Sequence, residues 1–576
     1  MKQLLLTLIG LCCVAISLMA TEPLFTYAEH SVLQKGKWVK ISVDQTGIYQ
    51  LTYQDLQNMG FSHPENIKVF GYGGNMLPEH FNQEARLADD LPEIPIYMEK
   101  GNDGIFNTGD YILFYAQGPT KVTYNSNSSS FTHTQNPYST KGYYFLTTDA
   151  GQGKRINKQA AENGKSFTSI TKTYRYFYHE KELENLLKSG RDWYGETFNA
   201  EKNTLTLTFN IPHITTDNIY LNACYIGKGE GLHRLILDTE SESNSLLVYG
   251  SSSSYISASK GKIAKKVAQP GANPLTITCT YQPPFNNSQA HLDYVGISAY
   301  QQLHMYGAQL PIFYPTNFRY DHVYQYVLSN ATPAVKIWDI TNPIEAKEMP
   351  VERENNQLSF TAKTLSDRYF IAVNTQGEFP TPTVIGTISN QDLHSWGHTD
   401  MVIISHPDYV SEAERLASHH RSHDGYTVKV VTPDKIYNEF SSGTPDASAY
   451  RWLMKMLYDR AENEQLRPKH LLFMGIAYYD NRGIKHNVPA MLSYQSTESL
   501  NSTLSYVTDD YYTLLEDNEG RSIESGSMDI GVGRFPVSSK TEAKQCVDKT
   551  IHYATQSDYG TWRNTFTFMA DDGDGN

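Results

Sequence analysis

The spacing of hydrophobic residues divides the chain into a strand-rich first part and a last third in which strands and helices alternate. Up to residue 150, apolar and polar positions alternate with the period of two that predicts half-buried strands. These runs occupy residues 37–43, 47–51, 67–72, 93–98 and 111–115, and a short helical pattern lies at 52–59. We therefore predict a small β-rich domain over residues 21–150.

Short alternating runs return after a polar stretch at 119–137, which we interpret as a surface loop. They lie at 204–209, 218–225, 232–237, 275–281, 294–300, 335–338, 358–361 and 369–373. Many short strands at regular spacing are typical of an all-β sandwich. We therefore predict a β-sandwich-like domain over residues 151–380, with one inserted helix at 180–187.

The pattern changes after a linker rich in proline and glycine at 376–382. Apolar runs at 401–404, 426–431, 470–475, 528–533 and 565–570 alternate with helical patterns at 409–423, 447–465 and 540–554. Such alternation predicts a mainly parallel, doubly wound α/β sheet, here over residues 381–576. The segment 478–518 has no clear helical pattern, and we expect it to form a long functional insertion at the ligand-facing edge.

The predicted fold class is α/β plus all-β, with an α/β domain that is incomplete. The last apolar run is followed by a loop and by no further helix. In open α/β sheets the chemistry takes place beyond the carboxyl ends of the strands. We therefore expect the chain to carry the scaffold of an enzyme without its catalytic residues.

The first twenty residues have the features of a cleaved secretion signal. Lys2 precedes an apolar run from Leu4 to Met19, and Ala20 offers a small residue for cleavage. The run is short for a membrane-spanning helix, which needs about 20 apolar residues. We therefore predict a signal peptide over residues 1–20 and export of the protein.

Charge and cysteine content narrow the possible partners and compartments. The net charge of −14 argues against a nucleic-acid partner, because nucleic-acid binding calls for a basic surface. Cys224 and Cys279 both lie in predicted strands and could form a disulfide in an oxidising compartment, and two buried thiols are the alternative. Cys546 lies on the last predicted helix, where we expect a core thiol.

Two acidic segments suggest Ca²⁺. The segment 99–110 resembles a calcium loop, but Gly101 stands where an oxygen ligand is required, and a tight turn is the alternative. Asp571, Asp572 and Asp574 follow a predicted strand and offer three hard carboxylates, suited to Ca²⁺ or to the polar rim of a site.

Histidines and a pair of carboxylates offer further candidate chemistry. His406 directly follows the strand 401–404, where site residues lie in such folds, and a polar turn is the alternative. Three histidines on the next helix suggest a metal site or a solvated helix end: His419, His420 and His423. Asp509 and Asp510 lie beside aromatic residues and could recognise a cationic side chain, or could belong to a turn.

Several segments, in this order, resemble the type IX secretion system sortases, which are gingipain-related cysteine peptidases. The matches are the stretch 36–53, FMGIAYYDNR at 473–482, TDDYY at 508–512, GVGRFP at 531–536 and TIHY at 550–553. The order and spacing of these motifs are more specific than any one of them.

The resemblance implies a caspase- or gingipain-like peptidase domain with a Cys/His dyad. The family places the histidine in a Gly-His-Gly turn and the cysteine at an Ala-Thr-Cys strand end, and neither motif occurs in this sequence. No catalytic residue is therefore carried over, and we expect the chain itself to be inactive. In arginine-specific gingipains an aspartate that matches Asp509 binds the arginine before the scissile bond, so Asp509 and Asp510 are the implied substrate-binding residues. Gingipain domains also bind Ca²⁺, which favours a metal at Asp571, Asp572 and Asp574, and no other cofactor is implied.

The implied activity removes C-terminal signals from exported cargo proteins and attaches the cargo to surface lipopolysaccharide. A thioester intermediate would be resolved by an amine in place of water. The implied partners are cargo, lipopolysaccharide and other type IX components, at the outer membrane or cell surface. A non-catalytic surface binding protein and a secreted gingipain-like protease are the alternatives.

Overall fold

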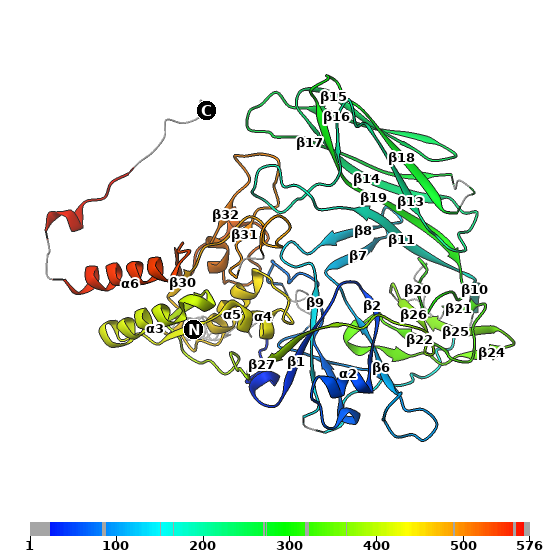
Figure 1. Cartoon of the computed structure of the whole chain (residues 1–576), viewed down its shortest axis with the longest axis horizontal. Helices are drawn as coiled ribbons and strands as arrows, with labels where there is room; N and C mark the ends of the chain where they lie inside the picture. Colours follow the sequence, from blue (N-terminus) through cyan, green and yellow to red (C-terminus); the bar gives the residue numbers. More distant parts are fainter. Residues whose placement is uncertain are drawn as a thin grey trace, which may run out of the picture.

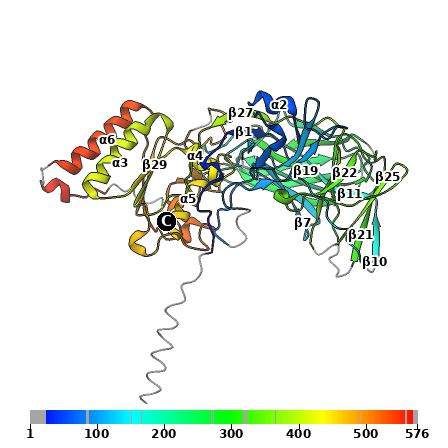
Figure 2. The same ribbon diagram turned by 90° about the horizontal axis from the view of Figure 1, so that it is seen from below.

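The protein is described from a computed structural model (Figures 1 and 2). The described residues are 24–82, 88–149, 151–164, 166–268, 271, 273–316, 322–363, 366–487, 490–556 and 560–568. The predicted signal peptide 1–20 and the carboxylates of Asp571, Asp572 and Asp574 lie outside them. Strands account for 37% of residues and helices for 16%, which confirms the predicted combination of all-β and α/β regions.

The N-terminal region forms two sheets around one core, as the alternating pattern predicts. One sheet has the order β27-β1-β9-β3-β4 and the other β2-β6-β5. The elements are β1 (Trp38–Val43), β2 (Gly47–Thr52), α2 (Tyr53–Asn58), β3 (Lys68–Phe70), β4 (Glu93–Ile94), β5 (Tyr97–Glu99), β6 (Tyr111–Ala116), β9 (Gly142–Thr147) and β27 (Thr383–Ile388). Strand β27 pairs antiparallel with β1, so the chain returns to this region just before it enters the α/β domain.

Two β-sandwiches lie between these segments, at the right of Figure 1. The first packs β11 (Lys172–Glu180), β12 (Thr197–Phe198), β14 (Ile219–Lys228), β17 (Ser259–Val267) and β19 (Gln289–Gln302) on β13 (Thr204–Phe209), β15 (Gly231–Asp238), β16 (Ser243–Gly250) and β18 (Leu275–Gln282). The second packs β10 (Ser166–Ile170), β21 (His322–Leu328), β24 (Glu352–Glu354) and β25 (Gln357–Lys363) on β20 (Gln309–Phe313), β22 (Val335–Asp339), β23 (Lys347–Glu348) and β26 (Tyr369–Asn374). Each has its own buried apolar core, so the region that the sequence predicts as one sandwich-like domain contains two.

Two local predictions in this region are wrong. The segment 119–137 is a hairpin of β7 (Thr120–Asn125) and β8 (Ser130–Gln135), because Phe131 is buried against aromatic side chains of the sandwiches. No helix forms at 180–187: β11 extends to Glu180, and Glu184 then bridges to Tyr194. Strand pairing across the chain outweighs the helical spacing of the local sequence.

The α/β domain is built on a parallel sheet with the order β29-β28-β30-β33. Its elements are β28 (Met401–Ser405), α3 (Val410–His419), β29 (Val428–Val431), α4 (Pro433–Phe440), α5 (Ser448–Asp459), β30 (His470–Met474), β31 (Tyr494–Gln495), β32 (Val507–Thr508), β33 (Gly531–Phe535) and α6 (Lys540–Thr555). Successive strand residues point to opposite faces: Ile403 packs with α3 and α6, whereas Val402 and Ile404 pack with α4 and α5. Helices therefore cover both faces, as Figure 2 shows, and the predicted doubly wound sheet is confirmed.

The predicted strand at 565–570 does not form in its described part. Residues 565–568 belong to no strand, and the side chains of Phe566 and Phe568 are 82% and 90% exposed. This segment follows a short 3₁₀ turn, Thr561–Asn564, and leads away from α6 in Figure 1. An alternating pattern becomes a strand only where the backbone finds a pairing partner, and this segment pairs with no described strand.

The N-terminal region and the α/β domain share a buried interface. Tyr72, Phe81 and Tyr138 pack in one cluster with Trp452 on α5. Lys40 on β1 donates hydrogen bonds to Asn438 Oδ1 (3.0 Å) and to the carbonyl oxygen of Gly443 (2.7 Å). Burial lowers the pKa of Lys40 to about 8. The β-rich region therefore supports one face of the α/β domain directly.

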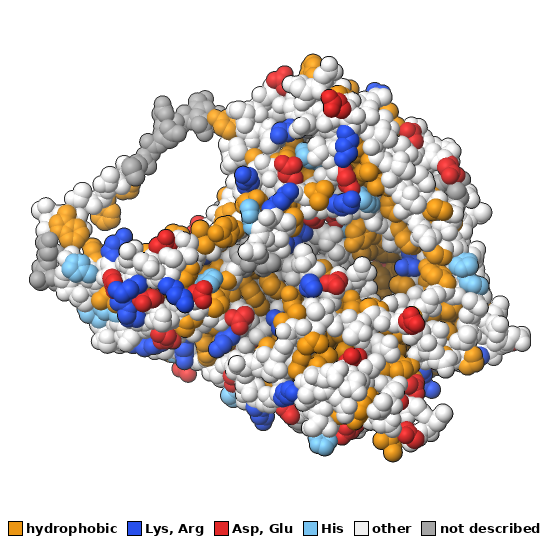
Figure 3. All heavy atoms as spheres, viewed as in Figure 1, with side chains coloured by type: hydrophobic (Ala, Val, Ile, Leu, Met, Phe, Trp, Pro, Cys, Tyr) orange, Lys and Arg blue, Asp and Glu red, His pale blue; other side chains and the backbone are white. Residues whose placement is uncertain are grey.

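The described helices are surface or core elements of these domains. None of the helices within the described ranges is long and apolar enough to cross a membrane. On the face in Figure 3, basic and acidic side chains intermingle over α3 and α6, where Arg415 forms ion pairs with Glu412 and Asp548, each at 2.7 Å.

Candidate functional site at the carboxyl edge of the parallel sheet

The carboxyl ends of three parallel strands meet at one edge of the sheet. His406 follows β28, and its backbone N–H donates to the carbonyl oxygen of Met474 at the end of β30 (2.9 Å). Gly475 follows β30, and its N–H donates to the carbonyl oxygen of Phe535 on β33 (3.0 Å). This is the edge at which ligands bind in open α/β sheets.

Gly475 fits this edge because no larger residue would. Its φ of +147° is rare for other residues, and a Cβ there would lie 2.6 Å from Met491 Sδ and 3.3 Å from the Cβ of His406. The backbone at Gly475 therefore lies close to the side chains around it. The carbonyl oxygen of Gly475 accepts a hydrogen bond from Arg534 at this edge.

Asp509 forms a bidentate ion pair with Arg534 at this edge. Arg534 donates from Nη2 to Asp509 Oδ1 (2.6 Å) and from Nε to Oδ2 (2.8 Å). Its third contact is to the carbonyl oxygen of Gly475 (3.1 Å), and its guanidinium lies 4.5 Å from the ring centroid of Phe473. Burial would lower the pKa of Arg534, but the hydrogen bonds and the charge of Asp509 raise it overall.

The partner of Asp509 changes what this carboxylate can do. The side chains of Arg534 and Asp509 are 14% and 20% exposed, and both carboxylate oxygens already accept from the guanidinium. The side chain of Arg534 therefore binds the Asp509 carboxylate, which the family resemblance assigns to the arginine of the substrate. A second guanidinium would have to displace the first one.

Asp510 lies next in sequence but outside this pair. Its N–H donates to Thr508 Oγ1 (3.1 Å), and its carbonyl oxygen accepts from Thr513 Oγ1 (2.7 Å) in a 3₁₀ turn. The turn that the sequence offered as the alternative is therefore present. The substrate-binding role of Asp509 and Asp510 stays a prediction.

The insertion 478–518 is ordered around a buried carboxylate that the sequence analysis did not single out. Asp480 is fully buried and accepts three backbone N–H groups, from Ile484 (2.8 Å), Lys485 (2.6 Å) and His486 (3.0 Å). A carboxylate that caps successive N–H groups fixes a loop without regular secondary structure. The sequence Asp-Asn-Arg-Gly at 480–483 carries the turn signal that could have identified it.

The insertion also contacts the first sandwich beside a cavity of about 280 Å³ whose lining includes Glu182, Asp293 and Arg482. Arg482 donates to Glu182 (2.5 Å), and His133 on β8 bonds to Glu180 (2.8 Å). Burial and the nearby Glu180 raise the pKa of Glu182 to about 7, against the opposing charge of Arg482. The Arg482–Glu182 contact therefore joins the insertion to the sandwich, and the His133–Glu180 contact joins the β7–β8 hairpin to β11.

The three described cysteines do not form a nucleophilic site. Cys224 and Cys279 are free, fully buried thiols on the two facing sheets of the first sandwich. The two-thiol alternative is therefore confirmed, and the disulfide is absent. Cys546 lies between α6 and α3 and is only half-buried, so it lies at the margin of that core rather than within it as the sequence predicts. Within the described ranges, none of these thiols is hydrogen-bonded to a histidine.

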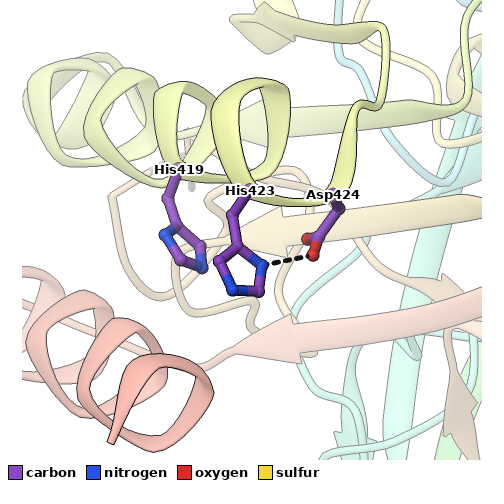
Figure 4. Close-up of side chains that lie close together, drawn as sticks. All are labelled: His419, His423 and Asp424. Atoms are coloured by element: carbon purple, nitrogen blue, oxygen red, sulfur yellow. Dashed lines mark hydrogen bonds and ion pairs between the residues drawn. The ribbon is translucent and has the colours of Figure 1, made fainter.

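Two of the other candidate sites predicted from the sequence form turns, and a third forms a cluster of possible metal ligands. His406 Nδ1 accepts from the N–H of Asp408 (3.1 Å), so the polar turn is present. In the segment 99–110, Asp103 accepts from Ile105 N–H (2.9 Å) and Asp110 accepts from Asn107 N–H (2.7 Å), which makes two tight turns in place of a calcium loop. The cluster of possible metal ligands found among the described residues comprises His419, His423 and Asp424 (Figure 4).

Comparison with known proteins identifies the domain that carries this edge. The peptidase family C25 matches residues 394–576. Residues 394–576 form a peptidase family C25 domain. This C25 domain contains the parallel sheet, the insertion and the Asp509–Arg534 pair, and it confirms the gingipain resemblance of the sequence motifs.

The fold is similar to that of a solved structure, dimeric latent PorU from Porphyromonas gingivalis. The two are 30% identical, the match covers 93% of this chain, and the TM-score is 0.82. The chain spans about half (51%) of the length of that PorU chain. The likeness therefore includes the β-rich domains as well as the C25 domain.

The remaining comparisons add nothing to this assignment. The CBM36-1 domain of a multidomain xylanase from the hindgut metagenome of Trinervitermes trinervoides is 15% identical with a TM-score of 0.15, and the match covers 21% of this chain and 96% of that domain. The globular domain of zebrafish complement 1qA is 10% identical with a TM-score of 0.13, covering 23% and 96%. Such scores carry no argument. A search of curated proteins found no significant match.

Proposed function

We propose that this chain is the N-terminal portion of a gingipain-family cysteine endopeptidase that acts as a type IX secretion sortase. The observation that carries the proposal is the likeness to latent PorU over 93% of the chain, β-rich domains included. The C25 domain supports the reaction class. The proposed substrates are exported cargo proteins with C-terminal signals, and the proposed acceptor is surface lipopolysaccharide.

The proposed reaction is an acyl transfer. A cysteine thiolate attacks the carbonyl carbon of the scissile peptide bond, the amine of the departing signal leaves with a proton, and a thioester remains. An amine of the acceptor then attacks the thioester, which forms an amide and releases the thiol. We propose that the chain alone does not perform these steps, because Cys224 and Cys279 are buried and Cys546 packs half-buried against α3.

The pair at the sheet edge supports a proposal about specificity. Because Arg534 already saturates the carboxylate of Asp509, the site is proposed not to select arginine before the scissile bond. Asp509 would instead fix Arg534 and the Gly475 carbonyl beneath the substrate backbone. Cleavage of cargo at a residue other than arginine is the expected consequence.

Export, location and metal content are proposed with this function. The proposed signal peptide at 1–20 would direct the chain out of the cytoplasm, and contact with other type IX components would hold it at the outer membrane or cell surface. Asp571, Asp572 and Asp574 are the proposed ligands of a Ca²⁺ ion, because three carboxylates suit a hard cation.

Deletion of the gene that encodes this chain in the source bacterium tests the proposal. Mass spectrometry of exported cargo should find C-terminal signals retained and lipopolysaccharide absent from the cargo, and the native gene on a plasmid should restore both. Normal processing in the deletion strain would contradict the sortase function.

The second candidate is a non-catalytic surface binding protein, which the packed environment of all three described thiols favours. Reading the gene past the Asn576 codon separates the two candidates. An in-frame Gly-His-Gly and a later Ala-Thr-Cys favour the peptidase, and a stop codon without them favours the binding protein. A secreted gingipain-like protease would instead require its own C-terminal export signal.

A further inference from the structure

A group of metal-type ligands lies at the end of α3, on the opposite edge of the sheet from Asp509. The helix α3 runs back from the carboxyl end of β28 toward the start of β29, and it ends in a π-turn, His420–Asp424, closed by Gly425 at φ +70°. Residues four apart on a helix lie on one face. His419 and His423 are four apart, and their rings stack with centroids 4.9 Å apart.

Three possible ligand atoms converge at this turn. One nitrogen of each ring and one carboxylate oxygen of Asp424 all lie within 4.8 Å of one another. Figure 4 shows the two rings side by side below the helix, with the carboxylate of Asp424 next to His423. Ligand atoms at about 2.0–2.2 Å from one ion are at most about 4.4 Å apart, so an ion that binds here draws these side chains closer together.

His419 supplies a second, independent observation. Its Nε2 atom is buried, and within the described ranges it has no hydrogen-bond partner. A buried polar nitrogen without a partner destabilises the folded protein. A metal ion between the rings would satisfy this atom, which the described protein groups leave unused.

The carboxylate of Asp424 is already held in a defined orientation. Its Oδ2 bonds to His420 Nδ1 (2.6 Å), and its Oδ1 bonds to His423 Nδ1 (2.7 Å). These bonds hold the carboxylate beside the His423 ring, and the bond to His423 Nδ1 must give way for Asp424 and His423 to bind the same ion as ligands. The carbonyl end of α3 adds partial negative charge, which favours a cation.

We propose that His419, His423 and Asp424 bind one divalent transition-metal ion, with Zn²⁺ as the ion of best fit. Two imidazoles four residues apart match the spacing found in zinc sites. A donor set rich in imidazole nitrogen favours Zn²⁺, Cu²⁺ or Ni²⁺ over Ca²⁺ and Mg²⁺, which bind oxygen ligands. Water completes the coordination sphere, because the side chains of His423 and Asp424 are 51% and 33% exposed.

The position of this site indicates a structural role. The ion would tie the last turn of α3 to the turn before β29, at the edge of the sheet away from the proposed substrate site. It would therefore stabilise the α/β domain without contacting the reacting atoms. The inference is independent of the proposed sortase function.

Isothermal titration of the full chain with Zn²⁺ tests the proposal, with a purification tag that contains no histidine. The native chain should bind one tight equivalent of Zn²⁺, and Co²⁺ at the same site should give a visible absorption band that Zn²⁺ abolishes. His419→Asn and His423→Asn should each weaken this binding by about tenfold or more. Added Zn²⁺ should raise the melting temperature of the native chain and not that of these variants.

His63→Asn is the matched control. His63 is also an exposed histidine beside a carboxylate, 3.3 Å from Glu65, but it lies outside the cluster, and its loss should leave the titration unchanged. Binding that is equally tight in the native chain, His419→Asn and His423→Asn would overturn the proposal. So would a native chain that takes up less than one equivalent of Zn²⁺.

Discussion

Arg534 is the residue that most changes the interpretation of the candidate site. It meets Asp509 through two hydrogen bonds and Gly475 through a third, and so joins the insertion to the ends of β30 and β33. Removing one partner of a largely buried ion pair strongly destabilises the folded protein, because the charge of the other partner is left without compensation. The pair is therefore expected to stabilise the edge as well as to define its chemistry.

Replacing Arg534 with methionine should lower the free energy of unfolding by about 2–4 kcal/mol, because Asp509 loses its cation. Arg415→Met is the control: this arginine pairs with the carboxylates of Glu412 and Asp548 but is 38% exposed, and its loss should cost less than about 1 kcal/mol. Urea unfolding of both variants provides the comparison. Equally small losses would mean that the Asp509–Arg534 pair contributes nothing.

The thiols of the first sandwich should be unreactive in the folded protein. Burial raises the pKa of Cys279 to about 12 and also raises that of Cys224, and the thiolate is the reactive form. In a chain that begins at Thr21, a thiol reagent should label at most Cys546 under native conditions and all three thiols in denaturant. Only one reactive thiol in denaturant would instead reveal a disulfide between Cys224 and Cys279.

Among the strands and helices, an alternating hydrophobic pattern forms a strand only where a neighbouring strand is available to pair with it. Strand β28 finds a parallel neighbour on each side and helices on both faces, whereas residues 565–568 find no described neighbour. The exposed side chains of Phe566 and Phe568 should therefore contribute little to the folded state.

The double variant Phe566→Ser, Phe568→Ser should change the free energy of unfolding by less than about 0.5 kcal/mol and make the protein more soluble, because two large apolar groups leave the surface. Ile403→Ala in the fully buried β28 is the comparison and should cost about 3 kcal/mol. Chemical unfolding measures both. A loss in the double variant comparable to that of Ile403→Ala would indicate that the phenylalanines pack in the sheet.

Much of the fold, but little of the site, could be predicted from the sequence. The period of two and the period of 3.6 located the sheets and helices of the C25 domain, because burial on one or two faces imposes those periods directly. The prediction of a helix at 180–187 was wrong because Glu184 forms a β-bridge with Tyr194. Asp509 could be identified from a motif, but its bond to Arg534 depends on a contact between residues 25 apart. Local spacing contains no information about such a pairing.

At the scale of the whole molecule, His394 connects the N-terminal region to the C25 domain. It is fully buried, 2.7 Å from Glu439 on α4 and 3.3 Å from Asp89 in the N-terminal region. Burial alone would lower the pKa of His394, but hydrogen bonds to Asp89 and Glu439, together with the charges of Asp89 and Asp90, raise it to about 9. The protonated histidine therefore stabilises the junction of the two regions.

This junction should make the stability of the protein depend on pH. Because the folded pKa of about 9 exceeds the ordinary value of 6.5, the contribution is complete below pH 6.5 and is lost as the pH rises through 9. The native chain should lose up to about 3 kcal/mol relative to His394→Gln over this range. Urea unfolding of both proteins at several pH values measures the difference, and a difference that does not change with pH would contradict the role of His394.

We propose that this chain provides the C25 scaffold and its β-rich supports, and that none of its described cysteines forms a dyad with a histidine. The most direct test incubates the purified chain with a thiol-directed peptidase probe and with cargo that carries a C-terminal signal. We expect no covalent labelling at a peptidase site and intact cargo. Cargo cleavage that a cysteine-peptidase inhibitor blocks, and that substitution of one of the three cysteines abolishes, would contradict it.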